Sequence, residues 1–208
     1  MTETRKPVLI DRAQAGLGVF AASDAGRYSL NFVHVSGSFT EASNGHVLAR
    51  LNHDGLTSDD FPVVDGQATA GADLLIDPDA LAKAAKSMPK RSHLPILETI
   101  HAGVNPAGET VLTTTDLDSP SITKVKSAEV AFPETDRVIP KDIPPTIAFS
   151  ARYLGQIAKW AQAHGKLGKD TPIRFHVKDK DSAARLQVEL EDLRDALFVL
   201  MPVRVEGK

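Results

Sequence analysis

Apolar residues near the middle of the chain recur at the spacing of a helix, directly after a short apolar run. Within Asp73–Met88, intervals of three and four residues define one core-facing stripe, formed by Leu81, Ala84, Ala85 and Met88. Asp77 is suited to cap this helix, and Pro78 to its first position. Strand-like segments separated by Pro, Gly or Asp turns follow at Ile96–Val104, Thr110–Thr114 and Ser121–Val125. The pattern predicts a module of one strand, one helix and several further strands.

The same order of elements recurs near the end of the chain. Thr146–Phe149 is a predicted strand, and Ser150 is suited to cap the helix that follows. The apolar stripe of this second helix consists of Leu154, Ile157, Ala158 and Ala161. Gly165 and Gly168 are expected to end the helix. Further strands are predicted at Ile173–Val177, Ala184–Glu189 and Leu197–Met201.

The first part of the chain carries a weaker copy of the module. Val8–Asp11 begins a strand, but the Gly-rich segment Ala15–Gly26 lacks a helical pattern. Alternating strands are predicted at Ser29–Val35, Ser38–Ala42 and Val47–Leu51. Phe132–Pro140 is typical of a linker. We therefore expect an α+β fold with residues 1–140 as a first domain of two modules, the first having a degenerate or missing helix. Residues 141–208 form a third module.

Composition narrows the class of protein. The 208 residues are 42% hydrophobic and 25% charged, as in ordinary globular proteins, and contain no apolar run long enough to cross a membrane. The absence of cysteine excludes disulfides and thiolate metal sites, and together with the lack of a signal core it predicts a cytoplasmic protein. A net charge of −3 argues against a generally basic coat for nucleic acid but is compatible with a local basic surface.

The sequence offers no set of residues for catalysis. The seven histidines show no metal-ligand spacing, and no serine or cysteine nucleophile accompanies His46. Asp116 and Asp118 flank Leu117 as in a solvated hairpin more often than as in a cation site. We therefore predict no catalytic residue, no metal and no cofactor, and hence a protein that is not an enzyme.

Four segments, in a compatible order, resemble the bacterial DNA polymerase III sliding clamp (beta subunit) family. Ala42-Ser-Asn-Gly-His-Val-Leu-Ala-Arg50, after Arg27–Val35, is similar to a clamp stretch ending Ala-Thr-Asp-Gly-His-Arg-Leu-Ala, with Val47 in place of the arginine. Leu94-Pro-Ile-Leu97 with Thr115-Asp-Leu-Asp118 resembles Leu-Pro-Ile-Leu and Thr-Asp-Leu-Glu. Phe132–Pro140 resembles Phe-Pro-Asp-x-x-Arg-Val-x-Pro, and the final Met201-Pro-Val-Arg-Val205 resembles Met-Pro-x-Arg-Leu. A clamp chain has six such modules, and this sequence indicates three. The chain is therefore similar to a shortened, divergent relative of the family.

The resemblance implies a sliding-clamp fold, with repeated strand–helix–strands modules, antiparallel sheets and helices on one face. It implies a processivity factor that associates with duplex DNA without sequence specificity and tethers a polymerase or another DNA enzyme through a peptide-binding groove. The implied partners are double-stranded DNA, a polymerase or other clamp-binding protein, a clamp loader and further copies of the chain, with no membrane. The alternative is a non-encircling module that binds clamp-partner peptides without tethering to DNA.

In a clamp ring the helices line the hole, so their exposed faces are expected to contact phosphates. The resemblance therefore assigns DNA binding to basic residues in or just after the two helices, Lys83, Lys86, Lys90, Arg91, Arg152, Lys159 and Lys166. Both helices have almost no acidic residue after the first turn, which favours this assignment. The alternative is a solvated helix face whose C-terminal cations favour the helix dipole.

The resemblance also assigns three walls of a peptide-binding groove. The corresponding residues are Gly45, His46 and Leu48, then Pro78 and Leu81, then Met201, Pro202 and Val203. An apolar groove with an adaptable methionine suits a short peptide with hydrophobic anchors. The alternative is that these are core and turn residues that serve only the fold.

Overall fold

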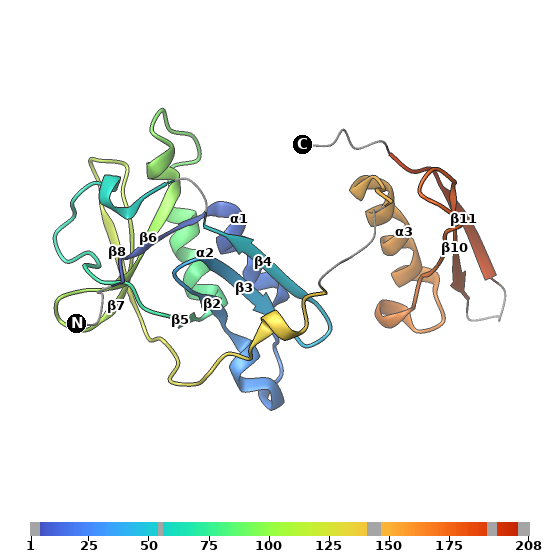
Figure 1. Ribbon diagram of the computed structural model, residues 1–208, viewed down its shortest axis with the longest axis horizontal. Coiled ribbons are helices and arrows are strands. Elements are labelled where there is room, and N and C mark those ends of the chain that lie inside the picture. Colours follow the sequence, from blue (N-terminus) through green and yellow to red (C-terminus); the bar gives the residue numbers. More distant parts are fainter. Residues whose placement is uncertain (1–4, 54–55, 141–146, 191–194, 204–208) are drawn as a thin grey trace. The chain divides into compact units, whose positions relative to one another are not determined.

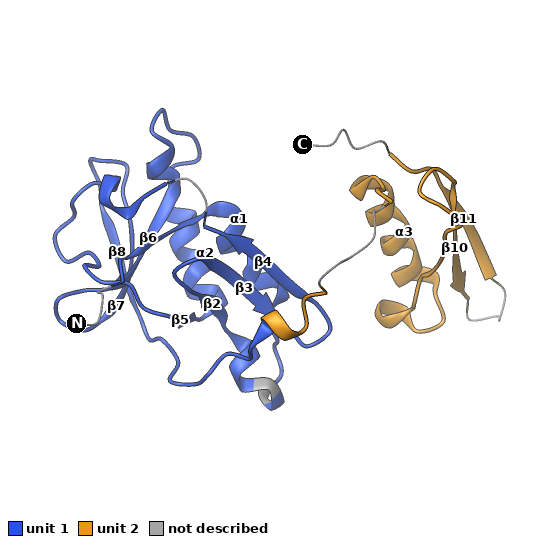
Figure 2. Ribbon diagram, viewed as in Figure 1, with its two compact units in different colours: residues 1–135 blue, residues 136–208 orange. Residues whose placement is uncertain are grey.

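The computed structural model describes residues 5–53, 56–140, 147–190 and 195–203. The chain forms two compact units, residues 1–135 (unit 1) and residues 136–208 (unit 2), which Figure 2 distinguishes by colour. Unit 1 contains two sheets and unit 2 contains one, and each unit has its own hydrophobic core. No helix in the described ranges has the length and apolar character that crossing a membrane requires.

Unit 1 contains two repeats of strand, helix and three further strands (Figure 1). The first repeat consists of β1 Val8–Asp11, α1 Arg12–Ala15, the 3₁₀ helices η1 Gly16–Phe20 and η2 Ala25–Asn31, β2 Val33–Val35, β3 Phe39–Ser43 and β4 Leu48–Asn52. After the short 3₁₀ helix η3 Ser58–Asp60, the second repeat consists of β5 Leu74–Ile76, α2 Pro78–Ser87, η4 Pro95–Glu98, β6 Thr99–Val104, β7 Thr110–Thr114 and β8 Ser121–Val125. The 3₁₀ helix η5 Thr135–Arg137 follows.

The two repeats of unit 1 exchange their first strands. The two antiparallel sheets have the orders β1-β6-β7-β8 and β4-β3-β2-β5. The first strand of the first repeat thus pairs with the second repeat, with Ile10 opposite Ile100. In return β5 pairs with β2, and Ile76 lies opposite Val33. Because each sheet needs a strand from the other repeat, the two repeats share one core and fold as one domain.

Helix α2 forms as the sequence predicts. The Asp77 side chain accepts hydrogen bonds from the backbone N–H groups of Asp79 and Ala80, which satisfies donors that the first turn leaves free. Leu81, Ala84 and Met88 are buried in the core of unit 1, and Ala85 packs against it. This confirms the predicted stripe.

The helix of the first repeat is a single turn, α1, in which Asp11 and Gln14 form a capping box, and it continues into η1 within the Gly-rich segment. Two predictions in unit 1 require correction. The predicted strand Ser29–Val35 is reduced to β2, since residues up to Asn31 form η2. The predicted strand Ile96–Val104 begins only at Thr99, because Pro95 starts the 3₁₀ helix η4.

Unit 2 contains a single repeat. It consists of α3 Ala151–His164, the 3₁₀ helix η6 Gly168–Asp170, β9 Arg174–His176, β10 Ala184–Glu189 and β11 Asp195–Leu200. The strands form one antiparallel sheet of order β11-β10-β9, and α3 covers one of its faces (Figure 1). Leu154 and Ile157 of the predicted stripe pack against Leu186 of the core. The stripe is therefore confirmed.

The beginning of unit 2 differs from its prediction. Thr146 lies outside the described residues, and Ile147–Phe149 is not a strand. Ser150 occupies the N-cap position of α3, but its side chain makes no capping hydrogen bond. In unit 1 the corresponding first strands pair with the sheet of the other repeat, and the described part of unit 2 has no second repeat to supply that sheet.

Candidate functional site

The predicted basic residues lie on the exposed side of each helix. Lys83 and Lys86 of α2 are exposed on the side opposite the buried stripe, and Lys90 and Arg91 are exposed just after the helix. Asp79, in the first turn, is the single acid of α2. The exposed face of α2 is therefore positive along most of its length, as contact with a phosphate backbone would require.

Helix α3 presents a similar face within unit 2. Arg152 and Lys159 are exposed, and α3 contains no acidic residue. Lys166 differs, because its Nζ lies 2.7 Å from Glu189 Oε1 in a surface ion pair. The hydrogen bond from Lys166 lowers the pKa of Glu189, so the pair remains charged at neutral pH. Lys166 thus has less free charge to offer a phosphate than Arg152 or Lys159.

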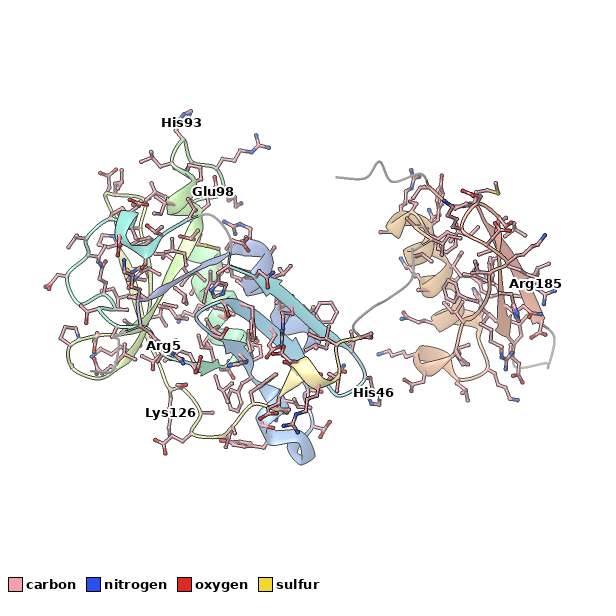
Figure 3. The ribbon with its side chains drawn as sticks, in the orientation of Figure 1. Arg5, His46, His93, Glu98, Lys126 and Arg185 are labelled. Carbon is pink, nitrogen blue, oxygen red and sulfur yellow. The ribbon has the colours of Figure 1, made fainter. Side chains whose placement is uncertain are left out.

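A tight hairpin places Gly45 and His46 at an exposed tip of unit 1, between β3 and β4 (Figure 3). Gly45 has φ = 83°, a conformation that residues with a Cβ rarely adopt. Asn44 Oδ1 accepts hydrogen bonds from the backbone N–H groups of His46 and Val47, which fixes the turn. Leu48, at the start of β4, is half-buried. The hairpin holds these three predicted residues close together.

The remaining predicted residues of unit 1 are in two different environments. Pro78 is partly exposed at the start of α2 and contacts η1, where a Cβ on Gly18 would lie 3.0 Å from Pro78 Cβ. Leu81 is 0% exposed in the core of unit 1. Its side chain therefore supports the fold and is excluded as a groove-lining residue, which corrects the assignment made from the resemblance.

The third predicted wall lines an apolar groove of about 690 Å³ within unit 2. Met201, Pro202 and Val203 contribute to it, together with α3 and β11 through Tyr153, Gln156, Ile157 and Leu197–Leu200. Met201 is 65% exposed and Val199 66%, so the groove is open to solvent. The Val203 N–H donates a 2.9 Å hydrogen bond to the Ala148 carbonyl, which fixes the end of the described chain beside the segment before α3.

The α3 and β11 residues of this groove are not among those that the sequence predicted. Leu197, Val199 and Met201 alternate along the strand and its continuation, and all three are more than half exposed. That alternation was visible in the sequence as a second apolar face. The pattern predicts a strand there but no groove, because a short apolar run does not show which of its faces is covered.

A buried ionic cluster joins the linker to the sheet of the first repeat. Glu41 is 1% exposed, His34 Nδ1 lies 2.9 Å from its Oε1, and Arg50 Nε donates to its Oε2 at 2.9 Å. Thr135 Oγ1 donates to the same Oε2 at 2.8 Å and accepts a hydrogen bond from Arg50. Phe132 stacks on the His34 ring with centroids 5.0 Å apart. Phe132 and Thr135 anchor the linker segment by these contacts.

The hydrogen bonds of the cluster determine the charge state of Glu41. Burial by itself raises the pKa of this carboxyl, but the hydrogen bonds from His34, Thr135 and Arg50 outweigh burial and lower the pKa below 4.5. Glu41 is therefore ionised and paired at neutral pH. A group in this state stabilises the fold and is poorly suited to proton transfer.

The described residues provide no metal centre. Within residues 5–53, 56–140, 147–190 and 195–203, no three ligating side chains are close enough to hold an ion. Asp116 accepts hydrogen bonds from the N–H groups of Asp118 and Ser119 in a turn. His101 stacks on Phe61 in the core, and burial lowers its pKa to about 4. These side chains have structural roles.

Comparisons with solved structures identify the fold. No protein-family model and no curated protein matches the chain. It is similar over its whole length to the DNA polymerase III beta chain of Streptococcus pneumoniae, with 17% identity, a TM-score of 0.64 and 52% of that chain covered. The DNA polymerase sliding clamps of Pseudomonas aeruginosa (14% identity, TM-score 0.66, 54% covered) and Caulobacter crescentus (18%, 0.62, 53%) also match over the whole chain.

These matches confirm the predicted fold class. The chain has the α+β sliding-clamp fold, and it spans about half the length of the clamps it matches. At these identities the likeness concerns the fold, and functional statements must come from the surfaces of this chain.

Proposed function

We propose that this chain is a sliding-clamp-like processivity factor that associates with duplex DNA and tethers a DNA enzyme. One observation carries the proposal: a chain with the clamp fold over its whole length has exposed basic faces on its helices, with few acids among them. The protein acts as a tether and performs no chemistry. Its effect is to raise the effective concentration of the enzyme at DNA.

In the proposed complex, α2 and α3 face the phosphate backbone. Lys83, Lys86 and Lys159 are long, flexible point charges, and such side chains neutralise phosphates without reading base edges. Binding of this kind releases counterions, so it weakens steeply with salt and allows sliding. Arg152, Lys90 and Arg91 would extend the same contact, and Lys166 would contribute least.

The groove of unit 2 is proposed to hold a short peptide of the tethered enzyme, a polymerase in the first instance. Its lining is apolar along Leu197–Val203, and Gln156 can hydrogen-bond to a peptide backbone. Met201 is unbranched and 65% exposed, so its side chain can adapt to different apolar side chains of a bound peptide. The hairpin residues Gly45, His46 and Leu48, together with Pro78, are proposed as peptide contacts on unit 1.

A closed ring requires several copies of a chain that spans half the length of a clamp chain. By the resemblance a ring contains twelve modules, so four copies are needed if each supplies three. A clamp loader is proposed to place the ring on DNA. Encirclement is tested by comparing retention on circular DNA with retention on linear DNA. The chain is mixed with nicked circular DNA at low concentration, concentrated and passed over a sizing column. A ring should travel with the circular DNA and be released when a restriction enzyme linearises it. Equal retention on circular and linear DNA would exclude encirclement.

A second function is favoured by the fact that the groove lies within unit 2 alone. The chain could bind clamp-partner peptides without enclosing DNA and so compete for them. Under this alternative the groove binds peptide, and the topological experiment shows no release on linearisation.

Replacing Met201 with alanine should weaken peptide binding about tenfold or more, because truncation removes an apolar contact from the groove. Binding is measured by fluorescence anisotropy with a labelled peptide from a clamp-binding polymerase. Val63→Ala is the matched control, since Val63 is 93% exposed in unit 1 and lies outside the groove. Equal affinities of Met201→Ala and the unaltered chain would place the peptide site elsewhere.

A further inference from the structure

The loop between α2 and β6 (residues 88–98, the α2–β6 loop) carries two of the cations that are proposed to meet DNA. Lys90 and Arg91 are exposed on this loop. Near its two ends, Met88 and Leu97 are buried in unit 1. Burial of the ends does not by itself fix the exposed backbone between them, so the direction of the two cations depends on further contacts.

Arg12, from the first repeat, holds the start of the loop. Its guanidinium donates hydrogen bonds to the backbone carbonyls of Ala85 at 3.0 Å, Pro89 at 3.1 Å and Met88 at 3.4 Å. The last carbonyls of a helix have no partner within the helix, and the planar fork of an arginine can satisfy several of them at once. Arg12 therefore fixes the backbone immediately before Lys90.

Glu98 holds the other side of the loop. Its Oε1 accepts a 2.6 Å hydrogen bond from the backbone N–H of Ser92, and Ser92 Oγ accepts one from the Leu94 N–H at 3.1 Å. Figure 3 shows His93 at the tip of the loop and Glu98, the last residue of η4, at its base. The carboxylate therefore fixes the backbone immediately after Arg91.

The charge of Glu98 is unfavourable for the surface that it supports. A carboxylate near a basic loop opposes the approach of a phosphate backbone. The hydrogen bond to Ser92 gives this acid a structural role that its charge does not explain. The backbone on both sides of Lys90 and Arg91 is thus held by side chains that lie outside the exposed tip.

We propose that Arg12 and Glu98 are positioning residues for DNA binding. They hold the α2–β6 loop in the conformation in which Lys90 and Arg91 meet the phosphate backbone, and neither of them has to contact DNA. A loop that is ordered before contact avoids the entropy cost of ordering it on binding. The inference rests on the proposed function, because it concerns the DNA contact of these two cations.

The variant Glu98→Ala separates positioning from charge, because the two effects differ in sign. Loss of a negative charge by itself would strengthen DNA binding. Loss of the contact with Ser92 should instead weaken it about tenfold, since Lys90 and Arg91 are then ordered only on binding. Glu98→Gln should recover most of the affinity, because its amide oxygen can accept the same hydrogen bond.

Fluorescence anisotropy with a labelled duplex at moderate salt measures these affinities. Glu129→Ala is the matched control, since it removes an exposed acid outside the loop and should not weaken binding. Far-ultraviolet circular dichroism checks that each variant is folded. Binding by Glu98→Ala that is as tight as that of the unaltered chain, or tighter, would overturn the proposal.

The role of Arg12 is tested with a double-mutant cycle. Arg12→Met should weaken binding about tenfold in the unaltered chain, and it should have no further effect once Lys90 and Arg91 are both replaced by glutamine. Lys126→Met, which removes an exposed cation just after β8, is the control for charge. If Arg12 contacted phosphates itself, its loss would weaken both chains by the same factor, and this result would contradict a positioning role.

A measurement without DNA tests the loop itself. Trypsin cleaves after Lys90 and Arg91, and a loop that is held on both sides should be cut slowly. Glu98→Ala and Arg12→Met should each raise the cleavage rate at these two sites at least about fivefold, because local opening becomes easier. Mass spectrometry follows the products, with cleavage at the exposed Lys180 of unit 2 as the internal reference. Unchanged rates would show that the two side chains do not hold the loop.

Failure of this inference differs from failure of the proposed function. An unaltered chain that does not bind duplex DNA would remove the function and the positioning role together. DNA binding that Glu98→Ala and Arg12→Met leave unchanged would retain the function and overturn the positioning role alone.

Discussion

Reversing three lysines on the helices, Lys83→Glu, Lys86→Glu and Lys159→Glu, should weaken DNA association by at least about a hundredfold at moderate salt. Each lysine is exposed on a helix face that carries few acids or none, so reversal replaces phosphate attraction with repulsion. The slope of the logarithm of affinity against the logarithm of salt concentration should fall by about three. Fluorescence anisotropy with a duplex at several salt concentrations measures both quantities.

A matched control separates this effect from overall charge. Lys126→Glu, Lys178→Glu and Lys180→Glu produce the same change in net charge at exposed positions outside the helices. This control should retain most of the affinity, because phosphate contact depends on local charge placement. If both triple variants bind as the unaltered chain does, the basic faces are solvated surfaces and DNA contact lies elsewhere.

Replacing Arg50 with methionine should lower the free energy of unfolding of unit 1 by about 3 kcal/mol. The side chains of Arg50 and Glu41 are 19% and 1% exposed, so methionine would leave an ionised carboxylate buried without its cationic partner. Urea unfolding followed by far-ultraviolet circular dichroism measures the change. Trp160 is the single tryptophan and lies in unit 2, so its fluorescence midpoint should remain constant.

The effect of Arg50→Met should depend on pH. The pKa of Glu41 is lower in the folded chain than its ordinary value of 4.5, so its stabilisation is complete above that value and is lost as pH falls through the folded pKa. The difference between Arg50→Met and the unaltered chain should therefore shrink in acid. A double-mutant cycle with Glu41→Gln isolates the pair. A loss below about 1 kcal/mol at neutral pH, the range of exposed pairs, would contradict the assigned role of Arg50.

The local pattern predicted both longer helices because each depends on residues close in sequence. The stripe from Leu81 to Met88, with the cap at Asp77, predicts α2 without tertiary information, and the Leu154 and Ile157 stripe predicts α3. The local pattern did not predict elements that are short or irregular. The one-turn helix α1 depends on a capping box and has no apolar stripe. At Pro95, η4 replaces the start of a predicted strand.

The candidate site was predicted by residue type more than by location. The basic helix residues are exposed as the sequence predicts, because the apolar stripe of each helix determines the opposite face. Leu81 is a counterexample, since a leucine suits a groove and a core equally, and only packing placed it at 0% exposure. The ion pair of Lys166 with Glu189 likewise joins residues distant in sequence, which no local pattern indicates.

The sequence by itself determined the helices α2 and α3, the cap at Asp77 and the order of the strands that follow each helix, because hydrophobic period and backbone preference act over a few residues. The tertiary structure decided which strands pair. Ile10 meets Ile100, and Thr135 meets Glu41, through contacts whose partners are far apart along the chain. Such contacts depend on the fit of surfaces that exist only after the elements form.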